Sequence, residues 1–153
     1  MFYEHRGFDF KDSSGPSGAL LMGGLTGGIG GGDSTCTMPE HWLYQDTGMK
    51  KGDTIAGLVG WQWHGRPVRE LPGLEVLAEG PIMPKNSQYH PHTATIYNGP
   101  QGNFVFNAGE IWWAQGLTPP PGHILPAHRY AKSQGPDSRV QPMMTNLLMQ
   151  FVS

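Results

Sequence analysis

The chain is poor in cysteine and in charge, and it has no long apolar run. Cys36 is its only cysteine in 153 residues, so no intrachain disulfide can form, which fits a reducing compartment. Charged residues make up 14% of the chain, against about 25% in ordinary soluble proteins. The net charge of −2 gives no electrostatic reason to expect nucleic acid or a membrane as partner. Because an apolar run of about 20 residues and a secretory leader are both lacking, we expect a cytoplasmic protein.

Glycine and proline, by contrast, are abundant. The 23 glycines and 14 prolines predict many ordered turns and long loops. They do not predict disorder, because hydrophobic residues make up 37% of the chain. The length suits one domain, residues 1–153. The aromatic residues at the start follow no cap or turn cluster, so we expect the chain to be a piece of a longer protein.

Hydrophobic patterns predict several strands and one helix. Residues 54–63 and 74–78 alternate or cluster as strands do. A hairpin is predicted from strands 93–97 and 103–106, joined by the turn Asn-Gly-Pro-Gln-Gly. Apolar residues from Val140 to Val152 recur with the 3.6-residue period of an amphipathic helix.

The N-terminal third is less regular. Phe2, Tyr3, Phe8 and Phe10 alternate with charged residues and predict one strand. The glycine cluster of residues 23–33 predicts a loop whose backbone N–H groups can approach an anion. No Gly-Lys-Ser/Thr and no helical segment follow it, so a structural loop is the favoured interpretation over a phosphate site.

The stretch of residues 102–117 predicts a strand that ends in a rim of aromatic residues. Its strand turns at Gly109 and is followed by Ile111–Trp113, expected as a short helix. In open α/β sheets, ligands bind at the carboxyl ends of strands, although the two tryptophans can also simply cover a sheet edge. The ligand-binding candidates are the tryptophans Trp42, Trp61, Trp63, Trp112 and Trp113.

Two groups of polar residues are candidates for chemistry. Glu40 and His41 precede Trp42, and His41 can act as a general base, or as a hydrogen-bonded structural histidine. Glu110 is a further acid–base candidate. The step His90-Pro91-His92 can present two nitrogens to a metal, although no glutamate follows it and solvated loop histidines are the ordinary alternative.

Several of these motifs, taken in order, resemble one family. The chain is similar to the C-terminal part of the large (beta) subunit of N,N-dimethylformamidase and its relatives. The resemblance extends over roughly residues 1–153. The motifs that carry it are Glu-His-Trp-Leu-Tyr at 40–44, Gly-Trp-Gln-Trp-His-Gly at 60–65, Thr-Ile-Tyr at 95–97, Val-Phe-Asn-Ala-Gly-Glu-Ile-Trp-Trp at 105–113 and Asp-Ser-Arg-Val-Gln at 137–141.

This resemblance implies a fold and an activity. The expected fold is a strand-rich α/β portion of a class I glutamine amidotransferase-like (flavodoxin-like) domain, with β-hairpin additions and a C-terminal amphipathic helix. The family implies hydrolysis of a small amide to an amine and formate, with an iron held by two tyrosines and a glutamate, and with a small second subunit. We expect the iron ligands upstream of Met1, so none is assigned to this chain.

Two departures from the family pattern bear on the activity. Gln62 stands where relatives commonly have glutamate, and Glu110 stands where a small hydroxyl residue is expected. The leading hypothesis is therefore a C-terminal lobe that contributes a scaffold and an aromatic pocket wall to an amidohydrolase. The alternatives are a module that binds a carbohydrate-like ligand or has a structural role, and a metal hydrolase using His41, His64, His90 and His92, which no known motif supports.

Overall fold

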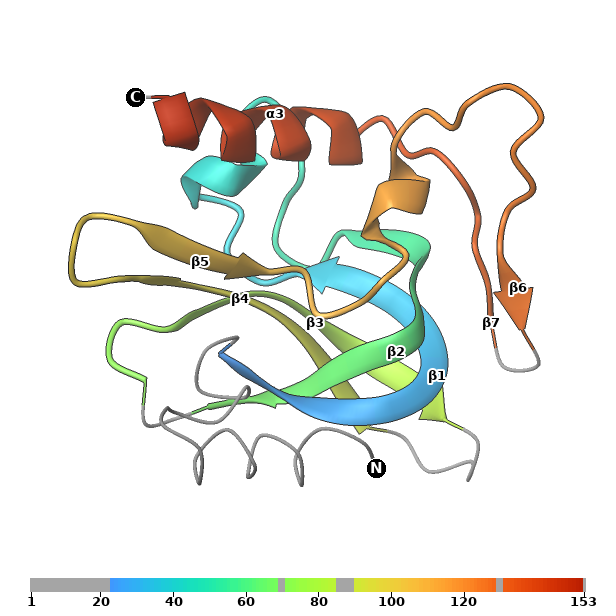
Figure 1. The fold of residues 1–153 in the computed structure, drawn as a ribbon, viewed down its shortest axis with the longest axis horizontal. Coiled ribbons are helices and arrows are strands. Elements are labelled where there is room, and N and C mark those ends of the chain that lie inside the picture. Colours follow the sequence, from blue (N-terminus) through green and yellow to red (C-terminus); the bar gives the residue numbers. More distant parts are fainter. Residues whose placement is uncertain (1–22, 69–70, 85–89, 129–130, 153) are drawn as a thin grey trace.

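The computed structural model describes residues 23–68, 71–84, 90–128 and 131–152 (Figure 1). Within them, five strands form one antiparallel sheet in the order β2-β1-β3-β4-β5. A two-stranded ribbon, two 3₁₀ turns and one α-helix complete the described part. The elements in chain order are β1 (Gly24–Cys36), η1 (Trp42–Tyr44), β2 (Thr54–Pro67), β3 (Glu75–Pro84), β4 (His90–Asn98), β5 (Phe104–Asn107), η2 (Trp113–Gly116), β6 (Ala127–His128), β7 (Ala131–Lys132) and α3 (Val140–Val152).

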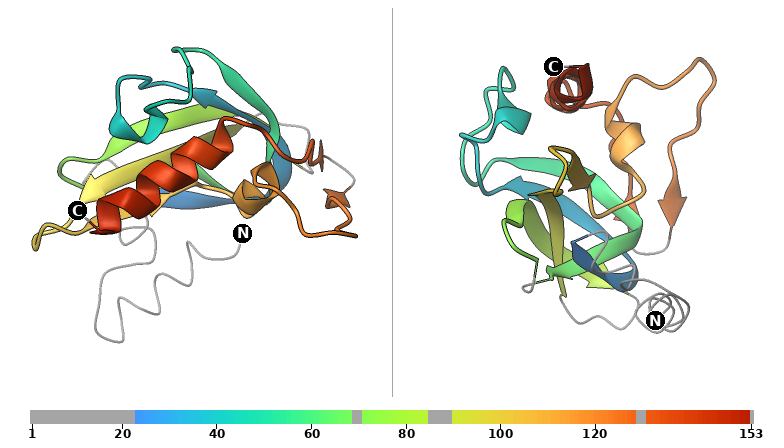
Figure 2. Two further views of the ribbon diagram at one scale, coloured as in Figure 1. Left: turned by 90° about the horizontal axis from the view of Figure 1, so that it is seen from above. Right: turned by 60° about the vertical axis from the view of Figure 1, so that its left-hand side comes forward.

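The expected flavodoxin-like α/β fold, and with it the glutamine amidotransferase-like assignment, is wrong. Every pairing among the described strands is antiparallel, and the described residues between β1 and β5 contain no α-helix. A parallel sheet needs a crossover of a dozen or more residues, usually a helix, between neighbouring strands. Here short turns join most strands directly, so the sequence folds as a strand-rich half-barrel with α3 packed across it (Figure 2).

The glycine cluster was also predicted wrongly as a loop, because most of it belongs to β1. Its glycines allow close approach of neighbouring elements. A Cβ on Gly31 would lie 2.0 Å from the Cβ of Ala131 in β7, and one on Gly32 would lie 2.4 Å from the carbonyl oxygen of Pro81. The strand therefore uses glycine for packing space and not for turning.

Other predictions are confirmed, some with longer bounds. The hairpin of β4 and β5 pairs Tyr97 with Val105 in register, and α3 spans the predicted helix. Strand β2 extends through Pro67, and β4 already begins at His90, where turn and loop were expected. The predicted strand over Phe2–Phe10 lies outside the described residues.

The sheet is strongly curved and nearly closes on itself. An isolated antiparallel bridge joins Trp63 of β2 to Glu110, three residues beyond the end of β5. Inside this curve lies a small apolar cluster of Val59, Trp63 and Ile82. The larger core lies between the sheet and α3, where Val140, Met143 and Leu147 are buried.

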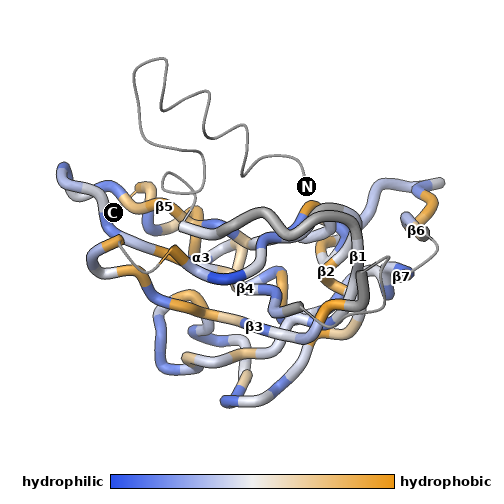
Figure 3. The backbone as a smooth tube through the Cα atoms, turned by 90° about the horizontal axis from the view of Figure 1, so that it is seen from below, coloured by the Kyte–Doolittle hydropathy of each residue, from blue (hydrophilic) through white to orange (hydrophobic). Residues whose placement is uncertain are grey.

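Polar contacts fix α3 to its neighbours. The side chain of Asn146 donates hydrogen bonds to the carbonyl oxygens of Leu43 and Gln45, at 2.9 and 2.8 Å, which ties η1 to the helix. Figure 3 shows that hydrophobic and hydrophilic stretches are interspersed along the backbone. The helix in the described ranges is too short to cross a bilayer.

Candidate functional site

Polar side chains gather where the segment after β5 meets β2 and β4. We call this cluster the polar seam; it consists of His64, His92, Asn107, Gly109 and Glu110. The backbone N–H of His64 donates to the carbonyl oxygen of Gly109 at 2.6 Å. The Asn107 side chain accepts from the N–H of Gly109 at 2.9 Å through Oδ1, and its Nδ2 lies 2.6 Å from Nδ1 of His64. One asparagine therefore joins the turn after β5 to strand β2.

Gly109 makes this tight turn possible. Its φ of 74° is one that residues with a side chain rarely adopt. A Cβ at this position would lie 2.1 Å from the carbonyl oxygen of Thr93 and 2.8 Å from Cε1 of His92. The turn predicted at Gly109 is confirmed, and the backbone there lies directly against β4.

Glu110 joins the seam through its backbone bridge to Trp63, and its carboxyl group lies near the backbone of Trp112 and Trp113. Although the residue as a whole is only partly buried, both carboxyl oxygens are buried and lack a hydrogen-bond partner within the described residues. Burial raises the pKa of the carboxyl well above its usual value, and the nearby N–H groups of Trp112 and Trp113 oppose this only in part. The carboxyl is therefore protonated over a wider pH range than an exposed glutamate.

His92 is fully buried in β4 beside the seam. Neither of its ring nitrogens makes a hydrogen bond of good geometry with a described residue. Burial lowers its pKa to about 4, against partial opposition from the backbone of Gly109 and His64. His64 also has a lowered pKa because of burial. At neutral pH the histidines of the seam are therefore uncharged.

An open cavity of a different character lies between β5 and α3. We call it the apolar groove; its volume is about 520 Å³. Aromatic and aliphatic side chains line it, with no charged residue among them: Phe104, Val105, Phe106, Ala108, Trp113, Met144, Leu147, Leu148 and Phe151. Such a volume and lining are within the range of pockets that bind small molecules.

Aromatic contacts extend the groove toward η1. The rings of Phe104 and Phe151 stack with centroids 4.7 Å apart, and Trp42 meets Phe104 edge-on at 5.6 Å. Phe106 meets Trp113 edge-on at 5.5 Å. These distances lie in the range of favourable aromatic pairs, so the wall is built from rings that orient one another.

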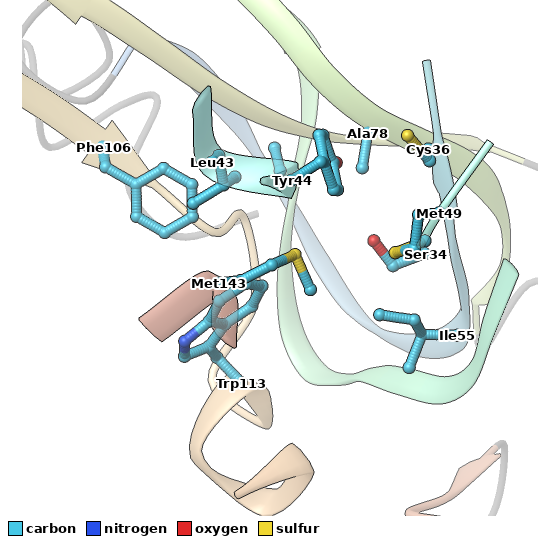
Figure 4. Close-up of a pocket in the computed structure, with 11 residues that line it drawn as sticks. Ser34, Cys36, Leu43, Tyr44, Met49, Ile55, Ala78, Phe106, Trp113 and Met143 are labelled. Atoms are coloured by element: carbon cyan, nitrogen blue, oxygen red, sulfur yellow. The ribbon is translucent and has the colours of Figure 1, made fainter. Parts of the chain in front are cut away.

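A second, much smaller cavity lies deeper, between the groove and β1 (Figure 4). Its volume of about 10 Å³ is about enough for one water molecule. Phe106 and Trp113 line both cavities, so these rings separate the groove from the interior. Cys36 and Tyr44 lie on the inner side. The hydroxyl of Tyr44 donates to the carbonyl oxygen of Leu77 at 2.7 Å, and burial raises the pKa of both Cys36 and Tyr44.

His41 makes a hydrogen bond that stabilises the 3₁₀ turn η1. Its Nδ1 accepts a hydrogen bond from the N–H of Leu43 at 3.1 Å and so caps η1. Burial lowers the pKa of this ring, which favours the neutral form that can accept the bond. Glu40 is exposed beside it, and the ring of Trp42 lies 4.8 Å away. Glu40 and His41 therefore lie at η1, whereas Glu110 lies in the seam.

The structure divides the five tryptophans among different places. Trp113 lines the groove, and the ring of Trp42 contacts Phe104, which also lines it. Trp63 and Trp112 are 2% and 3% exposed, and Trp112 lies so close to Gly60 that a Cβ there would meet its ring. Trp61 is 49% exposed and has a φ of 67°.

The described residues do not fit the iron site that the family resemblance implies. No group of three or more His, Cys, Asp or Glu side chains lies close enough together in the described ranges to hold a metal ion. The hydroxyl of Tyr44 is already used in its hydrogen bond to the carbonyl oxygen of Leu77. His90 begins β4 opposite Ile82, and His92 lies opposite Gly80. We assign no chemistry through a metal here.

Two residues of the seam escaped prediction as site residues. The sequence analysis assigns no role to Asn107, and it includes His64 only in the metal-hydrolase alternative. No local signal joins them, because they are separated by 43 positions and meet through the curvature of the sheet. A glycine follows each of them closely, Gly65 after His64 and Gly109 after Asn107. These glycines are the one local sign in the sequence that another part of the backbone approaches closely.

Comparison with known proteins identifies the family. Residues 9–130 match the family described as N,N-dimethylformamidase beta subunit-like, C-terminal. That range includes β1 to β6, the seam and the β5 side of the groove, whereas α3 lies beyond it. No curated protein and no solved structure matches significantly. The chain therefore belongs to the family of C-terminal domains found in N,N-dimethylformamidase beta subunit-like proteins.

Proposed function

We propose that this domain is the C-terminal lobe of an N,N-dimethylformamidase-like amidohydrolase, to which it contributes a scaffold and an aromatic pocket wall. The family match over residues 9–130 carries this proposal. The reaction would be hydrolysis of a C–N bond in a small, non-peptide amide. The groups that carry out the chemistry, including an iron, would belong to the remainder of a longer chain or to a second subunit.

The apolar groove supports the role of a wall. Its lining is uncharged, and Phe106 and Trp113 form its inner end. A small dialkyl amide has apolar substituents that such rings accommodate, while its carbonyl needs polar groups that the groove lacks. The wall therefore shapes the pocket around the alkyl substituents of the amide and excludes water from them. Another part of the enzyme supplies the polar groups that activate the amide carbonyl.

Amine release from N,N-dimethylformamide tests this proposal. We expect no turnover by the purified 153-residue chain and measurable turnover by the complete enzyme that carries it. Turnover by the chain alone, at the rate of the complete enzyme, would contradict the proposal. So would a complete enzyme that releases no amine from any small amide.

Trp61 favours a second candidate function, binding of a flat ligand such as a sugar. It is a bulky residue at positive φ, a conformation that costs free energy and is often found at functional sites. Its ring is half-exposed. Titration of tryptophan fluorescence with a glycan panel, in the parent chain and in Trp61→Ala, separates the two functions; an unchanged signal removes this candidate.

A further inference from the structure

Contacts of the polar seam hold the segment after β5 against β2. The backbone N–H of His64 donates to the carbonyl oxygen of Gly109 at 2.6 Å, next to the bridge between Trp63 and Glu110. Beside it, the ring Nδ1 of His64 lies 2.6 Å from Nδ2 of Asn107. Strands β2 and β5 stand at opposite ends of the strand order β2-β1-β3-β4-β5. These contacts therefore close the half-barrel, and a change in either of them acts on its closure.

The hydrogen bonds of Asn107 determine which atom donates in its contact with His64. A carboxamide has one acceptor oxygen and one NH2 donor group. Its Oδ1 accepts from the N–H of Gly109 at 2.9 Å, so the NH2 group is the one that lies against His64. Nδ1 of His64 must then carry a lone pair and no proton, which places the ring proton on Nε2. The bond therefore exists only for the neutral ring in this one tautomer.

Protonation of His64 leaves this pair without a good alternative. The imidazolium carries a proton on both nitrogens, so its Nδ1–H would face the NH2 group of Asn107, donor against donor. Turning the carboxamide over would restore that contact, but it would bring the NH2 group against the N–H of Gly109. In either orientation Asn107 loses one of these two contacts, and leaving a donor unsatisfied costs free energy.

The elements packed against His64 bring two other titratable groups of the described residues into the seam. Strand β1 approaches through Gly24, where an added Cβ would lie 3.4 Å from the Cβ of His64, and so brings no charge. From β4, a positive charge on His64 would act against one on the buried ring of His92. The segment after β5 brings Glu110. Burial lowers the pKa of His64, so its ring is neutral at neutral pH and takes up a proton only as the pH falls.

We propose that the contact between His64 and Asn107 is an acid-sensitive latch, which closes the sheet while the imidazole is neutral and releases the segment after β5 when the imidazole is protonated. The released segment continues through Glu110 to Trp113, which lines the apolar groove, so acid loosens one wall of that groove. The latch goes beyond the proposed function, since it concerns closure of the sheet whether or not the chain serves an amidohydrolase.

NMR of the full 153-residue chain tests the latch without any substrate. At neutral pH we expect ring nitrogen spectra to show His64 as the neutral Nε2–H tautomer. The amide of His64 reports closure through its hydrogen-exchange protection factor, which corrects for the pH dependence of exchange itself. As the pH falls, this factor should drop about tenfold or more, with the same midpoint as the titration of the His64 ring. The amide of Cys36, bonded to the carbonyl oxygen of Asp53 at 2.8 Å, lies outside the seam and should keep its protection.

Two substitutions separate a latch from a merely structural contact. His64→Asn keeps an acceptor oxygen near the position of Nδ1 but has no titratable group, so the amide of residue 64 should stay protected as the pH falls. Asn107→Asp replaces the NH2 donor with a second acceptor oxygen, which favours the protonated ring. In that variant the pKa of His64 should rise above its ordinary value of 6.5, and its amide should stay protected at the pH where the parent chain opens.

Several results would overturn the proposal. One is a neutral His64 ring in the Nδ1–H tautomer. Another is a ring that becomes protonated while its amide keeps its protection, or an amide that loses protection only where His92 titrates. Loss of protection at Cys36 with the same midpoint would show global unfolding and no latch, as would an equal loss in His64→Asn and in the parent chain. If a variant does not fold, the tautomer and the paired midpoints in the parent chain decide.

Discussion

The polar seam and the apolar groove share the segment that follows β5, yet they distribute polarity in opposite ways. In the seam, the carboxyl of Glu110 and the ring of His92 are buried. In the groove, Phe151 and Leu148 are exposed on a helix whose other face is buried. Burying polar groups costs free energy, and so does exposing apolar ones.

The difference indicates separate roles for the two regions. The seam has short backbone and side-chain hydrogen bonds that close the sheet, and burial favours the neutral forms of its titratable groups. The seam is therefore a structural element: its polar groups make the hydrogen bonds that join β2 to the segment after β5 and close the half-barrel. The groove is open and lacks charge, which suits contact with a ligand or another segment. Substitutions in and around the two regions sharpen this comparison, taken from the largest expected effect to the smallest.

The largest effect is expected at the turn of the seam. Gly109→Ala should lower the free energy of unfolding by about 4 kcal/mol, since the added Cβ meets the backbone of Thr93 and φ is positive. Gly102→Ala is the matched control, because its φ is 77° with nothing within 4 Å of the added Cβ. It should cost only about 1 kcal/mol. Urea denaturation measures both, and equal costs would show that the seam is not tightly packed.

The two sides of α3 should respond differently to truncation. Met143 is 2% exposed, so Met143→Ala should cost about 3 kcal/mol through lost burial and a residual cavity. Leu148 lies toward the groove and is 53% exposed, so Leu148→Ala should cost less than about 1 kcal/mol. Thermal or urea unfolding measures the pair. A large loss for Leu148→Ala would mean that the groove is covered in the isolated chain.

The helix and the hairpin show how much the sequence alone could predict. Their periodic patterns and turn residues are local, and both elements were placed correctly. The fold class was not, because it came from a presumed family architecture and not from the pattern of hairpins. The seam was not predictable either. Its contacts join positions 64, 92 and 109, and they depend on how strongly the sheet curves.

The glycine cluster shows a related limit. A run of glycines normally predicts a loop. Here Gly31 and Gly32 accommodate Ala131 and Pro81, which come from distant parts of the chain. A single sequence does not contain that packing requirement in any local pattern. Of the candidates named from the sequence, Trp113 lies in the groove, whereas the residues around Glu110 emerged only from the structure.

The buried carboxyl of the seam predicts a pH dependence of stability. Since the folded pKa of Glu110 is raised above 4.5, both states are protonated at lower pH, and only the unfolded state ionises as pH rises. Stability should therefore fall with rising pH by about 1.4 kcal/mol per pH unit until the folded pKa is reached. Glu110→Gln should remove this fall. Urea midpoints of both proteins between pH 4.5 and 9 measure it, and identical slopes over this whole range would contradict a raised pKa.

His92 acts in the opposite direction at lower pH. Its folded pKa of about 4 lies below 6.5, so its contribution to stability is present above pH 6.5 and is lost as pH falls toward 4. The two groups oppose each other between pH 4.5 and 6.5. Because both proteins carry His92, its contribution cancels in the difference between the parent chain and Glu110→Gln.

The smallest effect is expected outside both regions, at the start of α3. Asp137 Oδ1 accepts a hydrogen bond from the N–H of Arg139 at 2.9 Å, and the two side chains form an ion pair at 2.7 Å. Asp137→Ala should cost about 1 kcal/mol, as loss of a helix cap usually does. The bonds to Arg139 hold the pKa of Asp137 below its usual value, so this contribution should fade as pH falls through that lowered pKa. Urea unfolding of both proteins at neutral and acidic pH measures it; an equal difference at both would contradict a carboxylate cap.

The most direct test compares Trp113→Ala with Glu110→Gln in the complete enzyme, with amine release from N,N-dimethylformamide as the readout. If the groove is the aromatic wall and the seam is structural, Trp113→Ala should lower kcat/KM at least tenfold. Glu110→Gln should then change it by less than about twofold at pH 7. Loss of turnover in Glu110→Gln with the fold intact, together with an unaffected Trp113→Ala, would contradict the account.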